Sequence, residues 1–190
     1  MEYAKFILNG EDKKILSHIK NTLASNGHIY LGYSKESNSI LRHIRSCLPD
    51  LIIIEVGSKF HEIKRTLEVI DEEILAACIL ILDNRTDDII EFLRKSRVIS
   101  YLTKPVFDEA LLQVIDMSLI NYSRVLNYEH KVKKLNDTLE SRKVVEKAKW
   151  ILVEKDGFTE AEAYEAIQKK SRDSRIPMLE IAEAIILTRG

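Results

Sequence analysis

The chain has 190 residues, of which 45% are hydrophobic and 31% charged, and its formal net charge at pH 7 is −1. This length holds about one to two domains, and the apolar content excludes wholesale disorder. The chain lacks the overall basic excess of a generic nucleic-acid binder, so any such binding requires a local cationic cluster. No apolar run approaches the roughly 18 residues of a membrane span, and the first residues do not have the shape of a signal peptide. We expect a cytoplasmic protein in which Cys47 and Cys78 are buried thiols rather than a disulfide or a metal site.

Strand and helix patterns alternate in the part of the chain before Pro105. Short apolar runs predict five strands, at residues 4–8, 29–33, 51–54, 78–82 and 98–102. Between them, apolar residues spaced three and four apart predict four helices. Two of the runs, 51–54 and 78–82, are apolar throughout, which is typical of strands covered by helices on both faces. The alternation predicts an α/β, flavodoxin-like (βα)5 fold with a doubly wound parallel sheet.

The order of these elements, and Thr103-Lys104-Pro105 after the fifth strand, resemble a response-regulator receiver domain covering about residues 1–120. The resemblance implies a pocket in which an acidic pair after the first strand and an Asp at the end of the third bind magnesium. That Asp accepts a phosphoryl group, a Thr or Ser ends the fourth strand, and a Lys follows the fifth. In this sequence the pocket positions fall on Gly10 and Glu11 (with Asp12 beside them), Glu55, Asp83 and Lys104.

Lys104 keeps the residue that the receiver family has, much of the rest of the pocket is changed, and the changes weaken the phosphorylation chemistry. One carboxylate of the acidic pair is missing, which weakens magnesium binding. Glu55 is one methylene longer than Asp, which displaces its oxygen by more than about an ångström, and an error of that size costs on the order of a hundredfold in rate. We therefore predict a pseudo-receiver with weak or absent magnesium binding, no other cofactor and no aspartyl phosphorylation. A plain ion pair between Glu55 and Lys104 is the preferred interpretation. The alternative is that Glu55 imitates the phosphorylated state, with less charge than an acyl phosphate.

A long helix without internal Gly or Pro is predicted from about Glu109 to Gly157, with Asp108 as its cap. Its apolar residues have the spacing of a coiled-coil seam, so residues 108–141 are expected to form a parallel homodimer. The alternative is that the stripe packs on the chain's own sheet or C-terminal helices, and we expect the first segment to pack partly on the sheet. The stripe consists of Leu112, Ile115, Leu119, Tyr122 and Leu126, then, shifted in phase, Val125, Tyr128, Val132, Leu135 and Leu139.

Three short helices are predicted within residues 142–187. Gly157 suits the end of the first, and Thr159 with Glu162 forms a capping box for the second. Pro177 suits the first turn of the third. Because none of these helices can bury its apolar stripe alone, the three are expected to pack together as an all-α bundle.

This bundle, at residues 142–190, resembles the ANTAR domain, the RNA-binding module of bacterial transcription antiterminators. The matching positions are Ala148, Lys149, Glu162, Ala163, Arg175, Pro177 and Ala182, whereas Trp150, Ser171 and Arg172 replace the usual Gly, Ala and Met. The resemblance implies RNA contacts by Lys149 and Arg175 above all. Further candidates are Ala148, Lys147, Lys169, Lys170, Arg172, Tyr164 and Trp150. The two aromatic residues are candidates for stacking on unpaired bases, although Tyr164 is equally suited to packing at the rim of the bundle.

The combined resemblances predict a dimeric antiterminator that holds paired hairpins in nascent leader RNA and so prevents a terminator from forming. The alternative is a protein-interaction module that sequesters a partner, with the cationic residues as a solvated face balanced by Glu160, Glu162 and Glu165. An enzyme is not expected, because the sequence has no nucleophile–base motif, Gly-rich phosphate loop or metal-ligand spacing. A DNA-binding regulator would need a basic recognition helix. We expect a regulatory protein or a ligand to supply the input, and no membrane contact.

Overall fold

A computed structural model of the chain describes residues 3–35, 37–57 and 60–189. The chain splits between Asn127 and Tyr128 into two compact units, and helix α5 (Asp108–Asp156) contributes to both. Each unit is described by itself. Within the described ranges, no helix combines the length and the apolar character needed to cross a bilayer.

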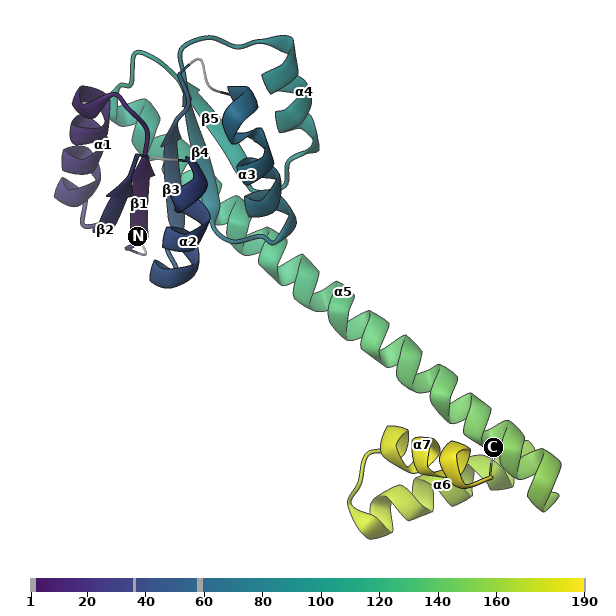
Figure 1. Ribbon diagram of the computed structural model, residues 1–190. Helices are drawn as coiled ribbons and strands as arrows, with labels where there is room; N and C mark the ends of the chain where they lie inside the picture. The colour runs from purple at the N-terminus through teal and green to yellow at the C-terminus, as the bar shows by residue number, and fades with distance from the viewer. Residues whose placement is uncertain (1–2, 36, 58–59, 190) are drawn as a thin grey trace. The chain divides into compact units, whose positions relative to one another are not determined.

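The first unit is built on a parallel sheet with strand order β2-β1-β3-β4-β5 (Figure 1). The strands are β1 (Lys5–Asn9), β2 (Ile29–Ser34), β3 (Leu51–Glu55), β4 (Ala77–Leu82) and β5 (Ile99–Thr103). The helices between them are α1 (Lys13–Ser25), α2 (Ser37–Cys47), α3 (Phe60–Glu72) and α4 (Asp87–Lys95). The flavodoxin-like (βα)5 prediction is confirmed, and the ends of the strands lie within one residue of the predicted ones.

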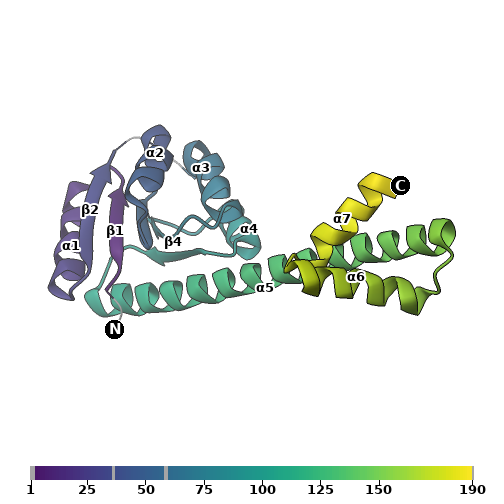
Figure 2. The same ribbon diagram turned by 90° about the horizontal axis from the view of Figure 1, so that it is seen from below.

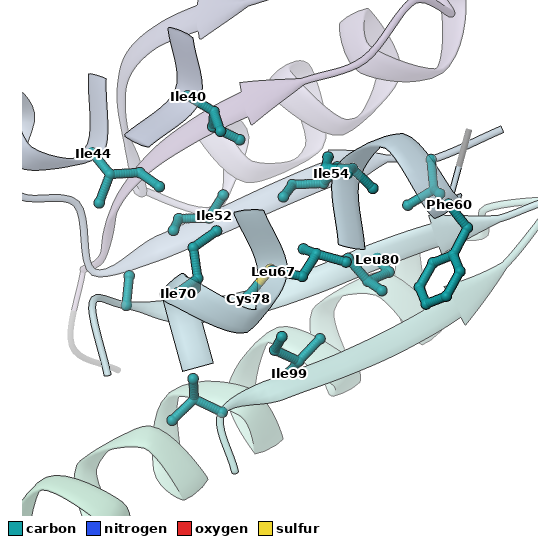
Figure 3. Close-up of a cluster of buried hydrophobic side chains, with 14 of the residues drawn as sticks. Ile40, Ile44, Ile52, Ile54, Phe60, Leu67, Ile70, Cys78, Leu80 and Ile99 are labelled. Atoms are coloured by element: carbon teal, nitrogen blue, oxygen red, sulfur yellow. The ribbon is translucent and has the colours of Figure 1, made fainter. Parts of the chain in front are cut away.

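Helices cover both faces of the sheet, which explains why β3 and β4 are apolar throughout. On one face, α1 and the start of α5 pack on a cluster that includes Ile53 and Ile79. On the other face, α2, α3 and α4 pack on a second cluster (Figure 3), in which Ile52 and Leu80 of the sheet lie under Leu67 of α3. Both cysteines are free thiols: Cys78 is buried in the second cluster, whereas Cys47, expected to be buried, is partly exposed because it ends α2.

The first part of α5 packs on the sheet, as expected, but through a slightly different set of residues. Leu111 and Ile115 are fully buried, and Tyr122 and Val125 pack against the core. Leu126, predicted to continue this stripe, is exposed instead. The buried stripe of α5 therefore ends at Val125, one residue earlier than the sequence pattern indicated.

The second unit is a small helical bundle made by the end of α5, α6 (Glu160–Ser174) and α7 (Met178–Arg189). Figure 2 shows α6 and α7 beside the last turns of α5. Gly157 takes a left-handed conformation, with φ of 72°, after the end of α5. Thr159 and Glu162 form the predicted capping box at the start of α6. The core of the bundle contains Ala148, Leu152, Ala163, Ile167, Ile181 and Ala182.

Candidate functional site

The first candidate site lies at the carboxyl ends of the strands in the first unit, where the loops after β1, β3, β4 and β5 meet. The ammonium Nζ of Lys104 lies 2.7 Å from Oε1 of Glu55 and 2.6 Å from Oδ1 of Asp83. Partial burial by itself would lower the pKa of Lys104, but hydrogen bonds to Asp83 and Glu55 outweigh it, so the pKa is raised. Lys104 is therefore a charged ammonium held between two carboxylates.

The second oxygen of Glu55 is also occupied. Its Oε2 accepts the backbone N–H of Glu11 at 3.1 Å and that of Asp12 at 3.4 Å. The carboxylate of Asp12 caps α1 by accepting the N–H groups of Lys14 and Ile15. Only 7% of the Glu55 side chain is exposed. Glu55 thus joins the start of α1 to β5 through its own two oxygens.

Gly10 fits this arrangement because it has no side chain. Its φ is +148°, and a Cβ built on it would lie 2.6 Å from Cβ and 3.0 Å from Oε2 of Glu55. Cβ atoms essentially never approach that closely, so an acidic residue at position 10 and Glu55 cannot both keep these positions. The loss of the acidic residue and the lengthening at position 55 are therefore linked by space. Among the described residues, no group of acidic, His or Cys side chains is arranged to hold a metal ion.

Sequence reasoning placed these pocket residues together but missed two of their contacts. The ion pair from Asp83 to Lys104 was not foreseen, and neither were the backbone N–H groups of Glu11 and Asp12 as donors to Glu55. Gly10 was the signal for the backbone contacts to Glu55, since a residue without a side chain leaves room for a longer neighbour.

The second candidate site is the surface of the C-terminal bundle, where the predicted RNA-binding residues separate into three groups. The first group surrounds Lys149 on α5. Its ammonium donates to Glu146 at 2.9 Å, and Glu160 of α6 lies 4.0 Å away. The hydrogen bond to Glu146 is the largest cause of the raised pKa of Lys149, and the charge of Tyr164 contributes weakly. Lys149 is thus a charged residue already held by carboxylates, with 12% of its side chain exposed.

The second group gathers at the end of α6 and in the loop after it. Residues 168–176 contain the cations Lys169, Lys170, Arg172 and Arg175 and a single acid, Asp173. All four cations are exposed, and in the described part of the chain no carboxylate pairs with any of them. Arg172 donates instead to the side-chain oxygen of Gln168 at 3.2 Å. This segment is a local cationic cluster in a nearly neutral chain.

Backbone geometry fixes where this cationic cluster sits. Arg175 ends α6 in a left-handed conformation, with φ of 56°. Ser171, which replaces the usual Ala, donates from Oγ to the carbonyl of Ile176 at 2.5 Å. That bond ties the last turn of α6 to the loop, so the departure from the family pattern has a structural role.

The third group lies on α5 itself. Ala148 is fully buried between the helices, so it positions them and offers no side-chain surface. Lys147 is exposed and makes no ion pair in the described ranges. Trp150 is 56% exposed. Residues two apart on a helix point about 160° away from each other, so Trp150 faces away from the contact that Ala148 and Leu152 make with α6 and α7. The structure does not bring Trp150 and Tyr164 together, and the ring does not block the helix approach.

The part of α5 before the bundle exposes an apolar stripe. Tyr128, Val132, Leu135 and Leu139 are each more than half exposed. Their spacing of four, three and four residues is that of a coiled-coil seam.

Comparisons with known proteins found similar proteins for both units. Residues 133–186 match the ANTAR domain family. The transcriptional regulatory protein PdtaR of Mycobacterium tuberculosis is 26% identical over 185 residues, which are 97% of this chain and 90% of that protein. The nitrate regulatory protein of Klebsiella oxytoca is 39% identical over 56 residues, 30% of this chain and 14% of that protein.

The first unit has similar solved structures at the level of fold. The signal receiver domain of a modulated diguanylate cyclase from Desulfovibrio desulfuricans G20 superposes with a TM-score of 0.56 and 14% identity, covering 64% of this chain and 98% of that one.

Proposed function

Because this chain joins a receiver-like domain to an ANTAR domain, we propose that it is a bacterial transcription antiterminator that binds paired hairpins in leader RNA. Binding of the hairpins would keep a terminator from forming, so polymerase would continue. The observation that carries the proposal is the unpaired cationic cluster at the end of α6, inside the segment that matches the ANTAR family. A net charge of −1 leaves such a local cluster as the electrostatic route to RNA.

The cationic cluster supplies phosphate contacts in this mechanism. Arg172 and Arg175 present planar guanidinium groups that bind phosphate oxygens in pairs, and Lys169 and Lys170 act as point charges beside them. Phosphate contacts position the RNA, whereas bases in hairpin loops are read by stacking and by their exposed edges. Tyr164, 42% exposed on α6, is the aromatic candidate for stacking.

Two bundles are needed to hold two hairpins, and the exposed stripe on α5 is the surface through which two chains associate in our proposal. An exposed heptad stripe on a helix is stable when a second helix covers it. A parallel homodimer through Tyr128, Val132, Leu135 and Leu139 brings one bundle per hairpin. Linking the two binding events raises the overall affinity far above that of a single bundle.

We propose that the receiver-like unit works without aspartyl phosphorylation. Its phosphoacceptor position is Glu55, both oxygens of which are engaged, and the Lys104 ammonium occupies the space between the Glu55 and Asp83 carboxylates. A divalent cation would have to displace these contacts. Incubation with acetyl phosphate or beryllofluoride and magnesium should leave the intact mass and the amide NMR shifts of Glu11 and Asp12 unchanged. An adduct on Glu55, or a magnesium-dependent shift of those amides, would contradict the proposal.

RNA binding is tested by fluorescence anisotropy with a labelled probe that carries two short hairpins in tandem. We expect saturable binding that Arg172→Ala/Arg175→Ala weakens. Each lost phosphate contact should also reduce the slope of log affinity against log salt by about 0.7 to 0.9. The matched control is Lys133→Ala/Lys134→Ala, which removes the same charge from the exposed middle of α5. Equal losses in both variants would show that only net charge matters.

The second candidate function is a protein-interaction module, favoured by the near-neutral net charge and by the exposed stripe. Its signature is the absence of saturable RNA binding at every salt concentration, together with an intact dimer. The anisotropy titration and a sedimentation measurement on the same sample therefore separate the two candidates.

A further inference from the structure

The loop between α6 and α7 begins with an arginine in a left-handed backbone conformation. Arg175 has φ of 56° and ψ of 33°, a region that favours Gly or Asn over a residue with a long side chain. Two backbone bonds close the turn around it. The N–H of Arg175 donates to the carbonyl of Arg172 at 3.3 Å, and the N–H of Ile176 donates to the carbonyl of Ser171 at 3.1 Å. This pair of bonds is the Schellman motif, which commonly ends a helix.

A side-chain bond adds a third closure to this turn. The two positions that Ser171 and Ile176 occupy in the Schellman motif commonly make an apolar contact, which holds the loop against the last turn of the helix. Ser171 stands where the ANTAR pattern has Ala, and its Oγ donates to the carbonyl of Ile176 at 2.5 Å. Ser171 and Ile176 are thus joined twice, once through the backbone and once through the hydroxyl. Pro177, the next residue, favours an extended conformation at Ile176.

The serine is not favoured by helix formation. Ala is the better helix former, because a serine side chain competes for backbone hydrogen bonds in other conformations. The bond from Ser171 to Ile176 offsets this disadvantage, so the bundle should be about as stable with Ala at position 171. What the bond changes is the freedom of the loop, since it restrains Ile176 and the residue directly before it. That residue is Arg175, one of the exposed cations of the cationic cluster.

We propose that Ser171 is a positioning residue, which holds Arg175 in its left-handed conformation before any ligand binds. The inference rests on the proposed function only for the identity of the ligand, which is an RNA phosphate. A loop that must order itself on binding loses conformational freedom, whereas a loop that is already formed avoids this loss. When only a fraction of the molecules has the binding conformation, the apparent affinity falls by that fraction. Ser171 thus raises the affinity without touching the RNA.

The first test needs no RNA. Amide hydrogen exchange is measured by NMR in the full-length protein at Arg175 and Ile176, whose N–H groups close the turn. Ser171→Ala should speed up the exchange of both amides severalfold, and Ser171→Thr, which keeps a hydroxyl, should restore slow exchange. The matched control is Ser174→Ala, because Ser174 donates from Oγ to the carbonyl of Lys170 within the helix. Unchanged exchange in Ser171→Ala would overturn the proposal.

The second test measures the affinity for the two-hairpin RNA by anisotropy at several salt concentrations. We expect Ser171→Ala to weaken binding about threefold or more, the effect of losing one restraining hydrogen bond. The slope of log affinity against log salt should stay the same, because no phosphate contact is lost. Arg175→Ala should instead reduce both the affinity and the slope. Ser171→Thr and Ser174→Ala should bind like the wild type.

Urea unfolding of the same variants distinguishes positioning from a general contribution to stability. We expect wild type and Ser171→Ala to unfold at nearly the same urea concentration, although they differ in affinity. A loss of affinity that follows a loss of stability, or a changed salt slope in Ser171→Ala, would overturn the positioning role. If the wild type binds no RNA, the proposed function fails, whereas the exchange rates still decide whether Ser171 holds the loop.

Discussion

The charged cluster of the first unit and the cationic cluster of the second differ in whether their charges are paired. In the first unit, Glu55, Asp83 and Lys104 satisfy one another at the carboxyl edge of the sheet. In the second unit, the cations at the end of α6 have no carboxylate partners among the described residues. A charge paired inside the protein has little left to offer a ligand, whereas an unpaired one keeps its full field. The contrast favours the cations at the end of α6 as the groups that bind an external ligand, as we propose above.

The units also differ in what supports them. The first has apolar clusters on both faces of a five-stranded sheet. The second has a thin core in which Ala148, Ala163 and Ala182 take part, so helices approach closely but bury little area. A core of this size supplies little stability by itself. We therefore expect the stability of the second unit to depend on its helix caps and, under our proposal, on the association of two chains.

Breaking the proposed dimer should have the largest effect. Val132→Glu/Leu135→Glu places charges in the seam, and we expect the affinity for the two-hairpin RNA to fall by about 10² to 10⁴, the range by which linked binding exceeds single binding. Affinity for a probe with one hairpin should hardly change, because each bundle stays intact. Anisotropy with both probes makes the measurement. Equal losses on both probes would mean that the substitution damages the bundle and not the dimer.

Most of the fold could be predicted from the sequence, because the spacing of apolar residues and the positions of capping residues determine its helices and strands. The apolar runs of β3 and β4, the capping box at Thr159 and the left-handed Gly157 are local signals with one structural solution. The charged contacts were harder to predict, because a sequence pattern shows on which face of a helix a residue lies but not which residue it contacts. The family resemblance suggested Lys149 as an RNA contact, but the sequence did not indicate that Glu146 on the same helix pairs with it.

The face of Trp150 was likewise not evident from the sequence. The family comparison emphasised the missing Gly, and only the packing of Ala148 and Leu152 shows that the ring lies on the other side of α5. Tertiary packing, which no local pattern encodes, supplied that fact.

The link between Gly10 and Glu55 gives the next largest effect. Gly10→Asp adds a Cβ where only 2.6 Å is available and imposes a φ of +148° on a residue that disfavours it. We expect the free energy of unfolding of the first unit to fall by about 1–3 kcal/mol, the usual cost of overpacking and of backbone strain. Urea unfolding measures the loss, and hydrogen exchange assigns it to β1 and β3.

Glu55→Asp is the matched partner of that change, because it shortens the side chain that the new Cβ would meet. In a double-mutant cycle, Gly10→Asp/Glu55→Asp should recover part of the loss, and the coupling measures the spatial link. It should also gain magnesium-dependent binding of beryllofluoride, which the wild type lacks under our proposal. Strict additivity of the two substitutions would show that positions 10 and 55 are independent.

The smallest expected effect concerns the cap of α6. Thr159→Ala removes a side chain that accepts the N–H of Glu162 and donates to its carboxylate, and such a loss costs about 1 kcal/mol of stability. The Thr159 backbone and side-chain hydrogen bonds hold the pKa of Glu162 below its ordinary 4.5. A carboxyl group whose pKa is lowered in the folded state stabilises that state at pH values above the ordinary pKa of the group. This stabilisation is lost as the pH falls through the folded-state pKa. The stability difference between wild type and variant should therefore narrow in acid. The control uses Glu162→Gln, which cannot titrate: the stability difference between Glu162→Gln and Glu162→Gln/Thr159→Ala should not depend on pH in this way. Both stability differences are measured by unfolding followed by Trp150 fluorescence, because Trp150 lies in the unit that contains the cap.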